Sequence, residues 1–141
     1  MNVGDIAISP SHELLAYSVD TSGYETYEIS IINLSSNELI SKITNVDDFE
    51  WGFDDNVLYY TKMDSAHRPY QVWKNRLNDS TADELIFEEK DELFWVGISK
   101  SEDRDLLLIG SSSKETSEIS FINLNSDNSG LTIIKERAQG V

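Results

Sequence analysis

The sequence lacks several features that would assign it to particular classes of protein. None of its 141 residues is cysteine, which excludes disulfides, thiolate catalysis and thiolate zinc sites. No apolar run approaches the roughly 20 residues that span a bilayer, and the first residues lack the basic and apolar regions of a secretory signal. These absences favour a cytoplasmic protein without a membrane partner.

Positive charge is also scarce. Eleven basic residues stand against 26 acidic ones, for a formal net charge of -15. Phosphate backbones and anionic membrane surfaces would be repelled, so nucleic acid is not expected as a partner. A basic ligand and simple solubility both remain compatible with this charge.

A convincing helical period is missing as well. Short runs of β-branched and aromatic residues alternate with turns rich in Ser, Asp, Asn and Gly, which is the pattern of an all-β protein. The only prolines, Pro10 and Pro69, fall in expected loops, where a missing N–H costs no ladder bond.

The chain contains an internal repeat, with offsets of 43 and then 47 residues. The third copy is imperfect, since Leu106 falls one place later than Leu15 and Leu58 predict. Periods of about 40–50 residues with several short strands are typical of propeller blades. The matching triplets are Ile6, Phe49 and Val96; Ile8, Trp51 and Ile98; Tyr27, Tyr70 and Ser117; and Leu34, Leu77 and Leu124.

The repeat predicts a partial β-propeller of about three four-stranded antiparallel blades in an open arc. The expected blades cover residues 3–44, 45–90 and 91–138. Their expected strands are 5–8, 14–19, 27–34 and 38–43; 49–53, 57–62, 70–77 and 84–88; and 94–98, 106–111, 117–124 and 131–135. Known propellers close with about 4–8 blades, so three would leave an apolar face uncovered at each end. Further blades are expected, from a longer polypeptide or from self-association.

Chemistry-bearing motifs are few. No Gly-x-Ser-x-Gly nucleophile elbow occurs, and His12 and His67, the only histidines, fall in expected turns without an identifiable orienting partner. Both are expected to be satisfied or solvated turn residues. The sequence therefore predicts no catalytic residue and no cofactor in this chain.

One stretch has the ligand spacing of a calcium loop. It consists of Asn125, Asp127, Ser129 and Gly130, with Glu136 in the last ligand position. Its first ligand is Asn rather than Asp, and its flanks are expected strands rather than helices. A polar hairpin turn is the better interpretation, and no metal site is expected.

Charged and aromatic side chains leave two interpretations open. Arg68 and the acidic run at residues 88–92 could contact a facing domain or a basic peptide, but solvated loops explain them more simply. Trp51, Trp73 and Trp95 are expected to pack between blades. Trp51 and Trp95 fall in or at the first strand of a blade, nearest a propeller's axis, so a channel-lining role stays open.

Several stretches resemble the propeller of the prolyl oligopeptidase family, and its oligopeptidase B branch in particular. They are residues 3–10 with 14–20, 58–61 with the His-Arg-Pro-Tyr segment at 67–73, 87–97, and 110–118. The resemblance extends over nearly all of residues 3–141. It implies a seven-bladed propeller that caps an α/β-hydrolase domain and screens substrates by size, and oligopeptidase B members cut after basic residues.

Several blades and the whole hydrolase domain have no counterpart here, so the family's catalytic Ser, Asp and His cannot be carried over. The leading hypothesis is a substrate-gating propeller segment of a serine oligopeptidase, with the hydrolase domain and short peptides, basic ones included, as partners. The alternative is a non-catalytic binding module that self-associates through open blade faces. A degenerate gene product remains a third interpretation.

Overall fold

The computed structural model describes residues 2–20, 27–52, 54–66, 68–77, 83–102, 105–114, 116–124 and 132–135. Within these ranges the regular structure is entirely β, so no described helix could cross a membrane. The strands are β1 (Asn2–Ile8), β2 (Leu14–Asp20), β3 (Tyr27–Asn33), β4 (Leu39–Trp51), β5 (Val57–Met63), β6 (Pro69–Arg76), β7 (Glu84–Glu88), β8 (Trp95–Lys100), β9 (Leu106–Ser112), β10 (Ser117–Asn123) and β11 (Thr132–Lys135). The all-β prediction is confirmed.

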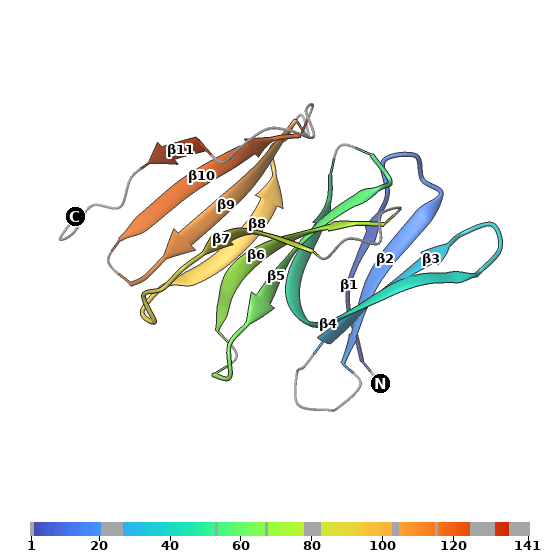
Figure 1. Ribbon diagram of the computed structural model, residues 1–141, viewed down its shortest axis with the longest axis horizontal. Helices are drawn as coiled ribbons and strands as arrows, with labels where there is room; N and C mark the ends of the chain where they lie inside the picture. The colour runs from blue at the N-terminus through green and yellow to red at the C-terminus, as the bar shows by residue number, and fades with distance from the viewer. Residues whose placement is uncertain are drawn as a thin grey trace.

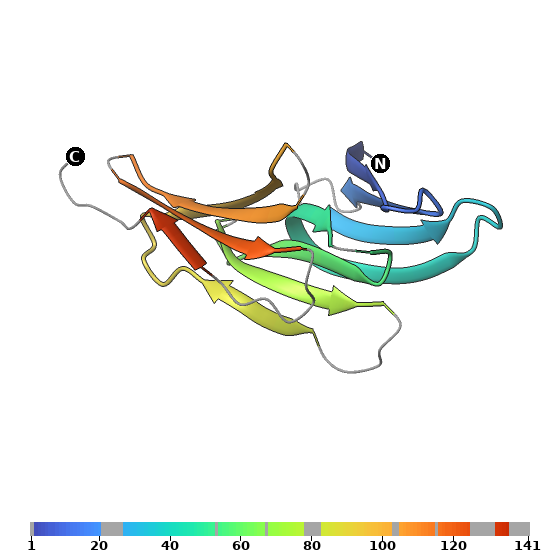
Figure 2. The same cartoon turned by 90° about the horizontal axis from the view of Figure 1, so that it is seen from above.

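The strands form two sheets in which sequence neighbours pair antiparallel. One sheet has seven strands in the order β1 to β7, and the other has four in the order β11-β10-β9-β8. Figures 1 and 2 show β1 to β3 in one half of the molecule and β8 to β11 in the other, with the sheets arranged as an arc rather than a ring. This arrangement agrees with a partial propeller.

The seven-stranded sheet differs from the prediction at β4. Residues 38–43 and 49–53 were expected to be separate strands, but one strand of 13 residues runs through both. Its first part pairs with β3 and its last part with β5, and Val46 pairs with both. Asn45 adopts φ 62°, a left-handed conformation that asparagine tolerates, so the strand bends there without ending. The first two repeats therefore share one continuous sheet.

Two apolar clusters hold the arc together, one between each pair of successive repeats. Strand β5 contributes to both because its side chains alternate. Leu58 and Tyr60 enter the first cluster, whereas Val57 and Tyr59 enter the second. The first cluster also contains Ala16, Ile29, Ile31, Ile43, Val46, Phe49 and Trp51, and the second contains Val72, Val96, Ile98, Leu107, Ile109, Ile122 and Leu124.

The first repeat exposes residues whose counterparts are buried. Ile6 and Ile8 are 63% and 54% exposed. The matching pairs, Phe49 with Trp51 and Val96 with Ile98, are all at least nine-tenths buried because each packs on the preceding repeat. Strand β1 has no preceding repeat in this chain, which explains the difference.

Replacement of Trp51 tests the packing between the first two repeats. Its indole is 1% exposed and donates a hydrogen bond of 2.9 Å from Nε1 to the carbonyl oxygen of Ala7. We expect Trp51→Ala to lower the free energy of unfolding by about 3–5 kcal/mol, because it opens a cavity at the interface. The matched control Trp95→Ala removes a half-exposed indole and should cost less than about 1 kcal/mol. Urea unfolding followed by circular dichroism measures both, and equal losses would contradict the assignment.

Candidate functional site on the inner strands

The first strand of each repeat lies against the first strand of the next. We call these the inner strands: β1, the last part of β4 (residues 46–51) and β8, with β1 contacting β4 and β4 contacting β8. Asp5, Asp48 and Trp95 occupy the same position of the repeat on these strands. The first strands of propeller blades surround the central channel, so these positions are where a channel would be lined.

The two aspartates have the same local structure. The register shifts between Val3 and Ile6 in β1 and between Val46 and Phe49 in β4, which are equivalent bulges. A bulge leaves an amide outside the ladder, and a buried hydroxyl accepts it in each case. The amide of Asp5 donates to Ser18 Oγ and that of Asp48 to Thr61 Oγ1, both at 2.8 Å.

Strand β8 has no such bulge. Trp95 pairs directly with Ser112, and the register continues without a shift to Lys100. The third repeat therefore presents an indole where the first two present carboxylates.

The ionised carboxylates of Asp47 and Asp48 in β4 destabilise the fold. Partial burial, followed by the negative charges of Asp47 and then Asp5, raises the pKa of Asp48 above its usual value, although its Oδ2 accepts a hydrogen bond of 3.4 Å from the amide of Ile98. Partial burial and the charge of Asp5 also raise the pKa of Asp47. No basic side chain of the described residues pairs with Asp47 or Asp48. A cation approaching these carboxylates would relieve their mutual repulsion.

These carboxylates do not make a metal site in the part of the chain that the structure describes. No group of three or more His, Asp or Glu residues there could hold a metal ion. The acidic positions are therefore better suited to a diffuse attraction of cationic groups than to coordination.

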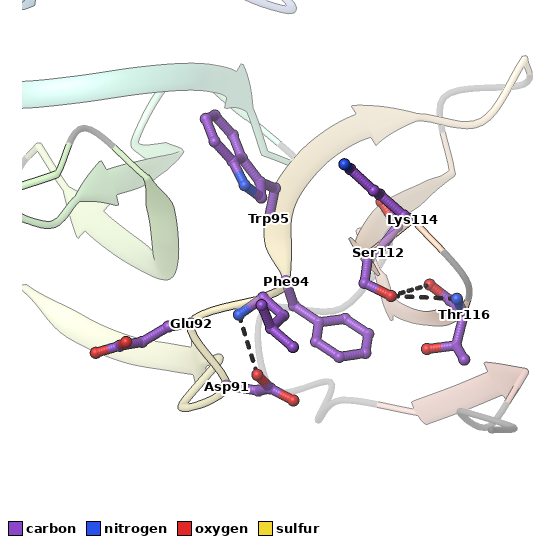
Figure 3. Close-up of a pocket in the computed structure, with 9 residues that line it drawn as sticks. Asp91, Glu92, Phe94, Trp95, Ser112, Lys114 and Thr116 are labelled. Carbon is purple, nitrogen blue, oxygen red and sulfur yellow. Dashed lines mark hydrogen bonds between the residues drawn. The ribbon is translucent and has the colours of Figure 1, made fainter. Parts of the chain in front are cut away.

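A cavity of about 670 Å³ lies beside Trp95 (Figure 3). Trp95 and Phe94 point to opposite sides of the chain, with Phe94 directed toward Thr116. Phe94 is buried, but Leu93 is 76% and Trp95 56% exposed. The lining residues are Asp91, Glu92, Leu93, Phe94, Trp95, Ser112, Ser113, Lys114 and Thr116. The cavity thus combines an apolar wall with charges of both signs.

Arg68 holds the loop that leads into β8. Its Nη1 donates to the carbonyl oxygens of Asp91 and Phe94, both at 2.8 Å, and its Nε contacts Asp64 Oδ2 at 3.0 Å. Its guanidinium also stacks over the ring of Tyr70, 5.4 Å from the centroid. The prediction of a solvated Arg68 is wrong, because the side chain is buried and its donors are directed at main-chain acceptors within the protein.

Glu89 continues this buried network, so the prediction of a solvated loop is wrong for this residue of the acidic run. Its carboxylate accepts hydrogen bonds from the hydroxyl of Ser111 in β9 and from the amide of Asp91. Glu89 follows β7, so it links the second repeat to the third. The rest of the acidic run, residues 88 and 90–92, is exposed as expected for a solvated loop.

The other candidates from the sequence do not form a site with the inner-strand carboxylates in the described part of the chain. His12 is exposed in the β1–β2 turn at φ 66°, with its amide donating to the carbonyl oxygen of Ser9. Trp51 packs between repeats as predicted, and half-buried Trp73 donates to Gln71 and lies under the ammonium of Lys62. The packing prediction is wrong for half-exposed Trp95. His67 and the calcium-like stretch at 125–130 with Glu136 lie outside the described residues.

Reasoning from the sequence missed the acidic positions. The repeat offset of 43 residues already aligns Asp5 with Asp48 and Ser18 with Thr61. That shared pairing of a carboxylate residue with a hydroxyl residue was the available signal. The proximity of Asp5 to Asp47 and Asp48 could not be obtained without the packing of β1 against β4.

The comparisons with known proteins agree with this architecture. The family model described as "Prolyl oligopeptidase, N-terminal beta-propeller domain" matches residues 1–141. "Protease 2" of Moraxella lacunata is 40% identical over 139 residues, which are 95% of this chain and 20% of that protein. The structure of oligopeptidase B from Leishmania major is 32% identical with a TM-score of 0.92, over 99% of this chain and 20% of that one.

A second oligopeptidase B structure gives the same result. The enzyme from Trypanosoma brucei, in a closed form with covalently bound antipain, is 30% identical with a TM-score of 0.87, over 99% of this chain and 20% of that one. The resemblance to the oligopeptidase B branch is confirmed. The chain spans about a fifth of the length of these relatives.

Truncation of Arg68 tests the buried network. We expect Arg68→Ala to lower the free energy of unfolding by about 3 kcal/mol, because it leaves Asp64 without its cation and removes the charged hydrogen bonds to the carbonyl oxygens of Asp91 and Phe94. Arg76→Ala is a matched control, since Arg76 makes a partly exposed ion pair with Glu84 and its loss should cost below about 0.5 kcal/mol. Urea unfolding measures both, and a loss for Arg68→Ala as small as the control's contradicts the assignment.

Neutralisation of Asp48 tests whether its ionised carboxylate destabilises the fold. Because the folded-state pKa is raised, the ionised carboxylate destabilises the fold at pH 7, and this cost disappears as the pH falls below the unfolded value of about 3.9. We expect Asp48→Asn to raise the urea midpoint at pH 7 and to leave it unchanged near pH 3.5.

Asp64→Asn serves as a control of opposite sign. Hydrogen bonds from the amide and guanidinium of Arg68 lower the pKa of Asp64, so its ionised form stabilises the fold above the usual aspartate range, and this stabilisation is lost as the pH falls through the lowered value. The variant should be less stable at pH 7, by a margin that shrinks in acid. A lower midpoint for Asp48→Asn at pH 7 would refute a destabilising charge at that position.

Proposed function

The chain belongs to the prolyl oligopeptidase family, as part of its N-terminal β-propeller domain, and on that premise we propose that it is a segment that controls how short peptides reach a serine-peptidase active site. Catalysis belongs, in this proposal, to an α/β-hydrolase domain elsewhere in a longer polypeptide. The match to peptidases about five times as long supports this division.

In this proposal the segment comprises three four-stranded blades. The first is β1 to β3 with the start of β4, the second is the end of β4 with β5 to β7, and the third is β8 to β11. The separate four-stranded sheet of the third repeat and the two apolar clusters between repeats support this division. The continuous β4 is then the connection that makes the outer strand of one blade the inner strand of the next.

The observation that carries the gating proposal is the pair of inner-strand carboxylates, Asp47 and Asp48, with which no basic side chain of the described residues pairs. Asp47 and Asp48 have raised pKa values, so the fold retains negative charge there at a cost to stability. Such a cost is frequently a mark of function rather than of folding. Carboxylates around a narrow channel would focus the field and concentrate cationic peptides at its mouth.

A second candidate is a binding module that takes a partner through its uncovered faces. The exposed Ile6 and Ile8 favour it, because contiguous exposed apolar residues often mark an interface. A discrete soluble oligomer of this chain alone in size-exclusion chromatography would support the module, whereas aggregation would support a segment of a larger protein.

Asp48→Asn in the full-length peptidase tests the electrostatic gate. At low salt we expect kcat/KM for short peptides with Lys or Arg to fall several-fold, and we expect high salt to remove most of the difference because the attraction is screened. Neutral peptides of the same length should be unaffected. Glu38→Gln, which removes the same charge from an exposed turn away from the inner strands, is the matched control. Equal effects of both variants would show that position does not matter and would overturn the gate.

A further inference from the structure

One face of the third repeat is apolar and uncovered in the described part of the chain. Strand alternation in β9 directs Leu107 and Ile109 into the second cluster, where they are 0% and 1% exposed. The opposite face carries Leu108 and Phe121, which are only half-buried, beside the exposed Trp95 and Ile119. Register places Leu108 directly opposite Phe121, so these side chains share one surface. We call it the open face.

Two glycines lie side by side in the middle of the open face. Gly97 of β8 and Gly110 of β9 are a cross-strand pair. A Cβ added to Gly110 would meet no described atom within 4 Å, and one added to Gly97 would meet only Asp48 Oδ2, at 3.5 Å. Glycine weakens the interior of a strand, and it often marks a place where another group approaches closely. No described atom approaches Gly110, so the part of the chain that the structure describes does not explain the glycine pair.

In the first repeat, a side chain of the next repeat packs against the position that corresponds to Gly97. Gly97 matches Ala7 in the first repeat, and there the next inner strand packs against it. Trp51 places its Nε1 2.9 Å from the carbonyl oxygen of Ala7, inside the first cluster. The second repeat carries the larger Glu50 at this position, and the strand that follows carries the smaller Ile98 where Trp51 stands. The sizes are complementary, as close packing requires.

Because neither glycine carries a side chain, Gly97 and Gly110 leave a space on the open face, here called the depression. We propose that the depression receives a large, aromatic side chain from the first strand of an adjoining blade of the same polypeptide. This inference rests on the proposed function, which supplies that blade. It continues the interface already formed twice in the arc. A second copy of this chain fits less well, because it would offer Ile8 at the matching position and leave part of the depression unfilled.

The size argument makes the proposal specific. In the full-length sequence, the residue that matches Trp51 and Ile98 in the following repeat should be Trp, Tyr, Phe or another side chain larger than Ile. A Gly, Ala or Ser at that position would overturn the proposal, even if the protein is a propeller peptidase.

Cysteine cross-linking in the full-length polypeptide tests the contact directly. Gly110→Cys is combined with a cysteine at the position of the following repeat that matches Trp51 and Ile98. No native cysteine within residues 1–141 competes with the introduced pair. A bifunctional thiol cross-linker of about 10 Å, the spacing of packed sheets, should join the two cysteines within one molecule in most molecules, whereas a direct disulfide needs Cα atoms within about 7 Å. A cysteine one residue further along that strand, on its other face, is the matched control and should not be cross-linked.

The other outcomes separate this proposal from the proposed function. No intramolecular cross-link in a protein that is otherwise a full-length peptidase would overturn the contact at Gly110 and leave the gating proposal intact. A cross-linked dimer formed by Gly110→Cys with Ile8→Cys of a second copy would overturn the adjoining blade as occupant. Absence of any polypeptide longer than this chain would overturn both.

Discussion

The need to bury both faces of the sheet governs this structure. Strand β5 shows it most clearly, because Leu58 and Tyr60 enter one apolar cluster while Val57 and Tyr59 enter the other. Sheet faces of this kind are stable only when a neighbour covers them. Among the described residues, the middle repeat has a neighbour on each side, and the first and third repeats each have one. The exposed Ile6 and Trp95 follow from that arrangement.

Polar groups between repeats fix the relative positions of the segments that the apolar clusters hold together. Arg68 and Glu89 are buried across the junction of the second and third repeats, where they fix the loop that leads into β8. Asp48 lies at the same junction and accepts from the amide of Ile98. The first two of these groups find partners of opposite polarity, whereas Asp48 lies among like charges. Repulsion between carboxylates on the inner strands therefore lowers the stability of the fold. The proposed function is assigned to these strands for that reason.

The sequence was sufficient for the architecture because the repeat and the period-2 alternation are local signals. Strand β7 was predicted with its observed ends, and the arc that the repeat predicts agrees with the two sheets. The continuous β4 was missed because it depends on Asn45 adopting a left-handed conformation within the strand. The burial of Arg68 was missed because its acceptors are main-chain carbonyls 23 and 26 residues away, which no charge pattern reveals. The exposure of Trp95 likewise depends on which blades surround it.

The mass of the native polypeptide tests the central claim, that these repeats need neighbours from the same chain, most directly. An antibody raised against the loop at residues 64–70 would identify the protein in an extract of the cells that make it. The account predicts a band several times larger than 16 kDa, as expected for a complete peptidase. A band at 16 kDa would contradict it, because the cell would then make an open arc whose end faces only a separate molecule could cover.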